Sequence, residues 1–301
     1  MASQRDVRNR ISSVKNIQKI TRALEMVAAA RLRRAEQRIE ALRPYAEAIR
    51  RMTRQAARDA GAEASRLPLL TAHESESNVG LLLITGDRGL AGAFNSQIIR
   101  AGVRAGAELA EQGLHSSWYA TGRRGVSSLS FRGHQLSGSY TGFADRPSYA
   151  DARTVADDLM TAYMDGHVDR VDLIYNTYVS PLTQHVSRET LLPISQATIA
   201  GEEQQAEQEG ELDGPRALVE YEPSPEEILR RLVPDYVEIS IYRALVESAA
   251  GFYGAQMTAM RNASENAGEL IEDLTLQMNR VRQAAITQEI MEVVAGAEGL
   301  G

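Results

Sequence analysis

Residues 11–30 read ISSVKNIQKITRALEMVAAA, and this stretch decides how the chain folds. Apolar residues return in it every three or four positions and continue at that spacing beyond Ala30, which predicts one face of a long helix. The face is narrow and consists of Ile11, Val14, Ile17, Ile20, Leu24, Val27 or Ala28, Leu32, Ala35, Ile39, Leu42, Ala46 and Ile49. A helix over residues 3–58 would be about 80 Å long at about 1.5 Å per residue, too long for a compact domain.

A second narrow apolar face lies near the C-terminus. Its heptad seam consists of Met260, Ala267, Ile271, Leu274, Met278, Val281 and Ala285, with Ser264 as a polar member. We expect a long helix over residues 235–295, which Pro234 separates from a short helix that begins at Pro225. Since neither face is wide enough for a globular core, the two terminal helices are predicted to pair as an antiparallel coiled coil. The pattern leaves a coiled coil between two copies of the chain open.

Between the terminal helices the apolar period changes to that of strands and short helices. The expected strands are 79–85, 116–120, 135–140, 171–179 and 183–193, with helices over 95–111 and 149–167. This alternation predicts a largely parallel sheet covered by helices, in a Rossmann-like α/β domain. The predicted domains are an N-terminal coiled-coil helix over 1–58, the central α/β domain over 59–224 with an acidic loop at 201–214, and a C-terminal helical region over 225–301.

The charge is divided unevenly along the 301 residues. Residues 1–58 hold 15 Lys and Arg against 5 Asp and Glu, whereas the remainder holds 18 against 35. A basic helix of this kind is a solvated face, or it meets an acidic protein, nucleic acid or an anionic membrane. No apolar run approaches the roughly 20 residues that cross a bilayer, and the absence of cysteine excludes disulfides and thiolate chemistry.

The sequence offers no constellation of residues for catalysis. The loop Gly86–Gly92 joins a strand to a helix, but it lacks the glycine spacing and the terminal lysine of a phosphate-binding loop. Its glycines are better explained by a tight turn, in which Asp87 and Arg88 pair with each other or with neighbours. The histidines lie far apart, and no nucleophile elbow is present. We therefore expect no catalytic residues, no metal ligands and no cofactor.

Three segments resemble the gamma subunit family of F-type ATP synthases. They are residues 11–30, the glycine-rich segment TGDRGLAGAFN at residues 85–95, and NRVRQAAITQEIMEVVAGA at residues 279–297. The similarity runs from end to end in length and order of elements. It implies a central rotor shaft whose coiled coil turns inside a ring of six nucleotide-binding subunits, coupling proton-driven rotation of the membrane ring to ATP synthesis, with no catalytic site of its own.

The resemblance also implies partners for individual residues. By family position, Arg282, Gln283, Thr287 and Glu289 contact the catalytic subunits, whose acidic lever segment makes Arg31, Arg33, Arg34 and Arg38 candidates to face it. Tyr221 and Glu222 match the segment that touches the rotor ring of the membrane sector. The implied partners are thus the alpha and beta subunits of the catalytic hexamer, the epsilon subunit and the membrane c-ring, with no nucleic acid.

The sequence departs from the family pattern at Leu24, where methionine is common, at Gln256, where arginine is expected, and at Glu298, which replaces a small or basic residue. The cysteine-containing insert of chloroplast relatives is missing, and no transit peptide precedes the match. The resemblance therefore implies a bacterial protein on the cytoplasmic side of the inner membrane, bound peripherally. Two other classes remain open, namely a nucleic-acid-binding coiled coil and a hydrolase built on the α/β domain.

Overall fold

The computed structural model describes residues 4–181, 183–194 and 224–298. Two long helices, α1 (Gln4–Ala60) and α6 (Pro225–Glu298), enclose a central α/β region in the sequence. The chain divides into two compact units, Met1–Ala30 with Gln256–Gly301, and Arg31–Ala255. The division falls inside both long helices, so each helix contributes one part to each unit.

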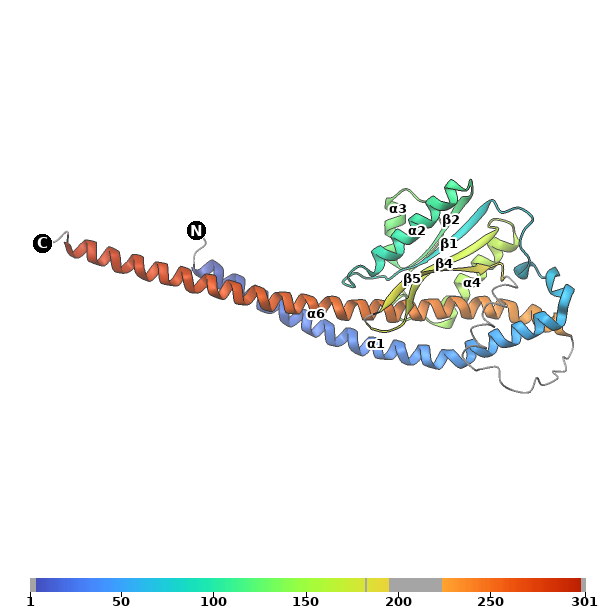
Figure 1. The fold of residues 1–301 in the computed structure, drawn as a ribbon, viewed down its shortest axis with the longest axis horizontal. Coiled ribbons are helices and arrows are strands. Elements are labelled where there is room, and N and C mark those ends of the chain that lie inside the picture. The colour runs from blue at the N-terminus through green and yellow to red at the C-terminus, as the bar shows by residue number, and fades with distance from the viewer. Residues whose placement is uncertain (1–3, 182, 195–223, 299–301) are drawn as a thin grey trace. The chain divides into compact units, whose positions relative to one another are not determined.

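The first unit is a helix pair (Figure 1). Val7, Ile11 and Val14 of α1 pack against Ala267 and Leu274 of α6, with Ile271 and Met278 at the edge of the cluster. These contacts bring the beginning of α1 next to the later part of α6, as an antiparallel pair requires. The predicted antiparallel coiled coil within one chain is confirmed.

The seam on α1 differs from the predicted one. Ile17 and Ile20 are 53% and 58% exposed, whereas Thr21 is buried and Gln18 is half-buried. The buried and half-buried positions repeat every 3.5 residues, as a coiled coil demands, and the isoleucines fall outside that repeat. The prediction that Ile17 and Ile20 belong to the seam was therefore wrong.

Polar members of this seam find partners within the unit. The Gln18 side-chain amide donates to the main-chain oxygen of Ser264 at 3.3 Å, and the Glu25 carboxylate accepts from Arg261 at 2.9 Å. Gln18 is half-buried and the Glu25–Arg261 pair lies at the exposed edge, and directional bonds of this kind favour one register of the helices over others. The middle of the helix pair is thus held by pairing of polar side chains as well as by apolar contacts.

The second unit contains a five-stranded sheet in the order β3-β2-β1-β4-β5. The strands are β1 (Asn78–Ile84), β2 (His115–Thr121), β3 (Leu136–Tyr140), β4 (Arg170–Tyr178) and β5 (Gln184–Leu192). All neighbours are parallel except β4 and β5, which form an antiparallel pair. This sheet confirms the predicted Rossmann-like α/β architecture, with each predicted strand present within one or two residues of its expected bounds.

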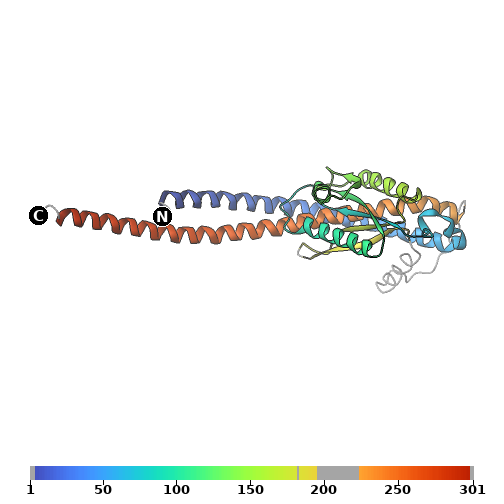
Figure 2. The same cartoon turned by 90° about the horizontal axis from the view of Figure 1, so that it is seen from above.

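Helices cover both faces of the sheet, as Figure 2 shows for α2 (Phe94–Glu111) and α4 (Tyr149–Met164). Side chains of β1 alternate between them. Leu83 meets α2 at Gly102, where an added methyl group would lie 2.5 Å from a Leu83 methyl. Leu82 and Ile84 belong to the cluster that contains α4.

The helix α3 (Arg123–Phe131) was not expected, because its only apolar residues are Val126, Leu129 and Phe131. Two 3-10 helices, Gly61–Arg66 and Pro68–Leu70, follow α1.

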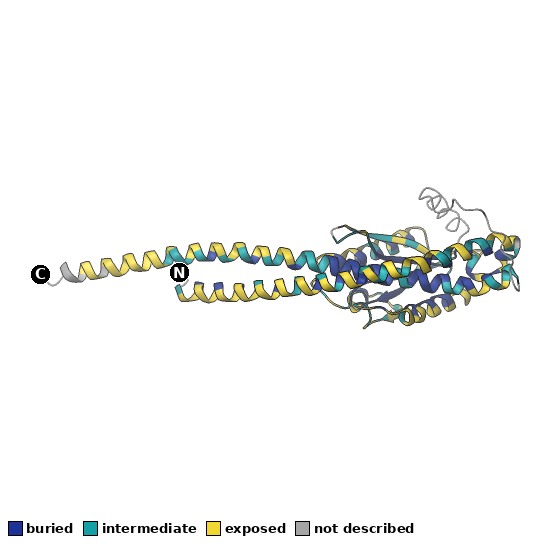
Figure 3. Cartoon of the chain, turned by 90° about the horizontal axis from the view of Figure 1, so that it is seen from below, coloured by how far each residue is buried: buried dark blue, intermediate teal, exposed yellow. Residues whose placement is uncertain are grey.

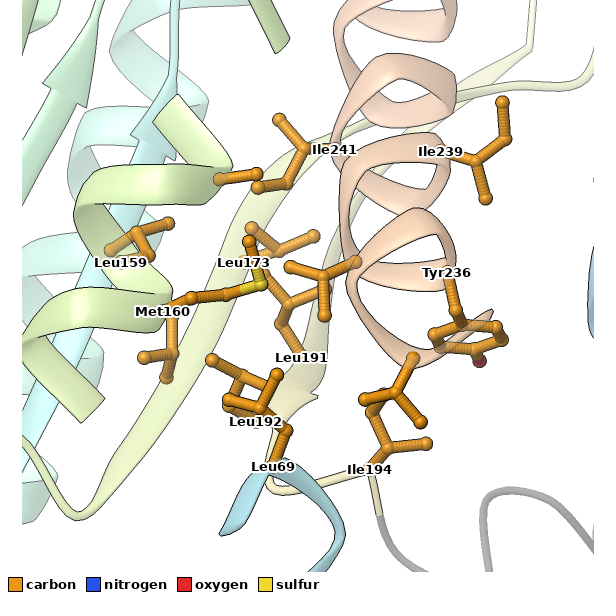
Figure 4. Packing of buried hydrophobic residues seen from close by; sticks show 14 of the residues in the cluster. Leu69, Leu159, Met160, Leu173, Leu191, Leu192, Ile194, Tyr236, Ile239 and Ile241 are labelled. Carbon is orange, nitrogen blue, oxygen red and sulfur yellow. The ribbon is translucent and has the colours of Figure 1, made fainter. Parts of the chain in front are cut away.

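The largest apolar cluster joins α4, the sheet and both long helices. Figure 4 shows Leu159 and Met160 of α4 close to Leu173 and Leu191 of the sheet, with Ile241 of α6 beside them. This packing explains why Pro234 does not end a helix there, contrary to prediction: Leu232, Val233, Tyr236 and Val237 around it are all buried. Burial of these side chains outweighs the hydrogen bond that proline removes from the helix. Pro44 likewise lies inside α1, which continues through it.

Close approach of β1 and β2 at their carboxyl ends requires Gly122. Its φ is +82°, and an added Cβ would lie 2.1 Å from the main-chain oxygen of Thr85. The Thr85 hydroxyl donates to the Thr121 carbonyl at 2.7 Å and accepts from the Gly125 N–H at 2.8 Å. The two loops that follow these strands are thereby joined through backbone groups, which have little freedom to move.

We predict that Gly122→Ala destabilises the chain by more than about 3 kcal/mol, because the methyl group meets backbone and the residue must remain left-handed. Gly133→Ala is the matched control, since Gly133 has a φ of +84° but open space around it. It should cost only about 1–2 kcal/mol, the left-handed penalty alone. Urea unfolding of the purified variants measures both values, and equal losses would contradict this explanation.

Candidate partner-binding surfaces

Residues 282–291 and 293–295 of α6 are all exposed. Figures 2 and 3 show α6 continuing past the beginning of α1, where its residues are coloured as exposed. The four residues of the predicted contact with the catalytic subunits lie there and are all exposed: Arg282, Gln283, Thr287 and Glu289. The Thr287 hydroxyl donates back to the Gln283 carbonyl at 2.9 Å, whereas the charged ends of Arg282 and Glu289 face solvent. The side chain of Glu298 lies outside the described residues.

Large apolar side chains are exposed on the same segment. Ile286, Ile290 and Val293 are 48%, 57% and 72% exposed, and Met291 and Val294 are exposed beside them. Ile286, Ile290, Val293 and Val294 follow the spacing of one helix face. We call these five residues the terminal apolar patch. A contiguous apolar patch that the folded chain does not cover is a mark of a protein–protein interface.

The sequence analysis did not identify the terminal apolar patch. The signal was present, because the apolar spacing continues from Ile286 to Val294 after the seam ends. What the sequence could not provide is where α1 begins relative to α6 in the folded pair. Val281 is half-buried and Ala285 is exposed, so the seam loses its partner between these two positions.

The four basic residues predicted to face the lever segment have different environments. Arg33 and Arg34 are exposed on α1, and Arg38 is half-buried. Arg31 instead lies 3.8 Å from the Asp145 carboxylate, with its guanidinium 5.7 Å from the centre of the Tyr253 ring. The structure therefore leaves Arg33 and Arg34 most accessible, while Arg31 has partners inside its own unit. Tyr221, Glu222 and the acidic loop 201–214 lie outside the described residues.

The glycine-rich loop after β1 is closed by the protein's own groups. The Asp87 carboxylate accepts hydrogen bonds from the backbone N–H groups of Arg123, Gly142 and Ala144 at 3.0–3.1 Å. Arg88 pairs with Asp145 at 3.3 Å. The expectation that Asp87 and Arg88 pair with neighbours is confirmed, and the loop's backbone turns left-handed at Leu90 and Gly92. Within the described residues, no helix is long and apolar enough to cross a membrane.

Comparison with known proteins identifies relatives over the whole length. The sequence model of a family described as ATP synthase matches residues 3–300. The ATP synthase gamma chain of Rubrobacter xylanophilus is 44% identical over 300 residues, covering 100% of this chain and 99% of the relative. The ATP synthase gamma chain of Nostoc punctiforme is 40% identical over 315 residues and covers 100% of both chains.

A solved structure has the same fold. In the mitochondrial ATP synthase of Euglena gracilis, a chain of the structure described as OSCP/F1/c-ring aligns with a TM-score of 0.65, at 18% identity, covering 99% of this chain and 94% of that one. At 18% identity the alignment supports a shared fold alone. The sequence relatives are bacterial, as the resemblance of the three segments implied.

We predict that the terminal apolar patch adds nothing to the stability of the free chain. Ile290→Gln should change the free energy of unfolding by less than about 0.5 kcal/mol, because the side chain is already in water. Leu274→Ala is the contrast, since Leu274 is 6% exposed in the seam, and it should cost about 2–4 kcal/mol. Thermal or urea unfolding of the free chain tests this; a large loss in Ile290→Gln would show that the patch is covered within the chain.

Proposed function

Because the chain belongs to the ATP synthase gamma-chain family, we propose that its helix pair is the turning shaft of the complex and that the end of α6 is the part that engages the catalytic subunits. The chain is the central-stalk subunit and carries no catalytic site of its own. The observation that carries the proposal is the exposure of α6 beyond its partner helix, where the terminal apolar patch and the polar residues of the family signature occur together.

The two kinds of side chain suit different parts of this task. Apolar contacts are non-directional, so the terminal apolar patch can turn within an apolar collar without a fixed angular preference. Hydrogen bonds and ion pairs depend on direction. Arg282, Gln283, Thr287 and Glu289 therefore supply contacts that form with one catalytic subunit and break as the shaft turns to the next.

The remaining partners follow from the family positions of the residues. Arg33, Arg34, Arg38 and the exposed side of Arg31 form a basic surface for the acidic lever segment of the beta subunit. Tyr221 and Glu222 are proposed to contact the c-ring, and the α/β domain to contact the epsilon subunit. We further propose that the chain is bound peripherally at the cytoplasmic side of a bacterial inner membrane, where it transmits the rotation that proton flow drives.

Replacing Arg282 and Gln283 together with Ala is predicted to lower ATP-driven turnover and proton pumping by about tenfold, while the subunits still assemble. Each polar contact has to be made and released, so each contributes only about 1–3 kcal/mol when formed. Turnover and pumping are measured on the purified complex in vesicles. Gln97→Ala with Arg100→Ala, both exposed on α2, is the control. Turnover equal to that of the control would show that these residues do not carry the contact.

The basic surface of α1 yields a separate prediction. Reversing Arg33, Arg34 and Arg38 to Glu should weaken assembly or coupling far more than reversing Arg123, Arg124 and Arg132, which are exposed on and after α3. The field of these charges decays over about 8 Å at physiological salt, so only an acidic surface in close contact feels it. The yield of intact complex and its ratio of pumping to hydrolysis are the readouts. Equal effects of the two triple reversals would contradict the proposed contact.

A further inference from the structure

One aspartate of the α/β domain is bonded to both long helices. The Asp145 carboxylate lies 3.8 Å from Arg31 of α1 and 3.3 Å from Arg88 of the glycine-rich loop. Its main-chain carbonyl accepts a hydrogen bond from the Tyr253 hydroxyl of α6 at 2.9 Å. Burial raises the pKa of Tyr253, and the nearby Asp145 raises it further, so the hydroxyl keeps the proton that it donates. Arg31 and Tyr253 also contact each other through the guanidinium and the ring.

The backbone around Asp145 is fixed to the sheet. Asp87 accepts from the N–H groups of Gly142 and Ala144, and the Gly86 N–H donates to the Asn95 side chain at 2.8 Å. Asn95 in turn donates to the Arg88 carbonyl at 3.1 Å. The loop that carries Asp145 therefore cannot shift without breaking bonds to the glycine-rich loop and, through it, to α2.

The position of this residue along the helices is specific. Arg31 is the first residue of the compact unit Arg31–Ala255 on α1, and Tyr253 lies two residues from its last residue on α6. Further along, the same unit holds α1 through the Tyr178 hydroxyl bonded to Glu36, and α6 through Arg243 bonded to Glu189 at 2.8 Å. Asp145 thus contacts both helices close to the ends of their segments in this unit, through Arg31 on α1 and Tyr253 on α6.

We propose that Asp145 is the torque-coupling residue of the shaft, a positioning residue that locks both helices to the α/β domain where they leave it. The inference rests on the proposed function, since it concerns how rotation of the domain reaches the helix pair. The apolar cluster below the sheet holds the helices against the domain, but apolar contacts resist separation better than twisting. Directional bonds to one rigid loop fix the angle of each helix relative to the sheet.

The test is the torsional stiffness of the shaft in the assembled complex. The catalytic ring is fixed to a surface, a bead is attached to the α/β domain, and the angular fluctuations of the bead are recorded with the complex stalled. Asp145→Ala removes the bond to α1, and Tyr253→Phe removes the hydrogen bond to α6 while keeping the ring. Both changes leave Arg33, Arg34 and Arg38 of the proposed basic surface in place, and Asp145→Ala removes the partner of Arg31 in that surface.

The double variant should be measurably less stiff than the wild-type complex, because it loses the directional contacts that Asp145 makes with α1 and α6 at this end. Asp157→Ala with Tyr242→Phe is the matched control, because Asp157 is exposed on α4 and the Tyr242 ring is retained. It should leave the stiffness unchanged. Pumping against an imposed proton gradient should fall in the double variant before unloaded ATP hydrolysis does.

A double variant whose torsional stiffness equals that of the control would overturn the proposal, even if its melting temperature were lower. A wild-type complex whose bead does not rotate when ATP is supplied would instead contradict the proposed function. Asp145→Asn distinguishes a structural role from a coupling role. It removes the charge pairing with Arg31 and Arg88, and it keeps the hydrogen bond from the Tyr253 hydroxyl to the main-chain carbonyl of residue 145. It should therefore lie between wild type and the double variant in stiffness.

Discussion

The paired seam of α1 and α6 determines what the rest of the molecule can do. Several of its members are small or polar, among them Gln18, Thr21 and Ala267, so the pair gains only a narrow strip of buried apolar surface. Such a pair depends on continuous register, which the bonds from Gln18 to Ser264 and from Glu25 to Arg261 help to specify. Because the seam is narrow, the rest of each helix surface remains in water. That exposed surface is what makes the pair available to a surrounding ring of subunits.

In the α/β domain, the sheet edge at which related architectures bind ligands holds one of the protein's own side chains. In open parallel sheets, ligands bind beyond the carboxyl ends of the strands, where loops and helix N-termini offer backbone N–H groups. Here the Asp87 carboxylate takes the N–H of Arg123, the first residue of α3, together with two from the loop before α4. The protein's own carboxylate thus accepts the hydrogen bonds of these backbone N–H groups. The loops fixed in this way carry Arg88 and Asp145, which connect the sheet to the helices.

The sequence was sufficient for the elements that depend on local periodicity. β1 is a nearly continuous apolar run, β4 is rich in Val, Leu, Ile and Tyr although it contains Asp172 and Asn176, and the C-terminal seam from Met260 to Val281 has a regular heptad spacing, so these elements could be predicted. Ile17 and Ile20 were misassigned because three or four residues of spacing fits a straight helix as well as a coiled coil, and only the partner selects the 3.5-residue repeat. The helix α6 continues through Pro234, and α3 forms, because tertiary packing overrides the local conformational preferences of the sequence. The position of Asp145 between two helices more than 100 residues away on either side could not be predicted, because no periodicity links Arg31, Asp145 and Tyr253.

The central claim is that the chain turns inside the complex as the shaft of its rotor. The chain contains no cysteine, so Phe131→Cys places a single thiol for a fluorophore at a side chain that is 94% exposed on α3. With the catalytic ring fixed to a surface, polarisation of that fluorophore reports the angle of the α/β domain during ATP hydrolysis. We expect stepwise rotation in one direction that stops when ATP is exhausted. A fluorophore that keeps a fixed angle while the same complex hydrolyses ATP would contradict the account.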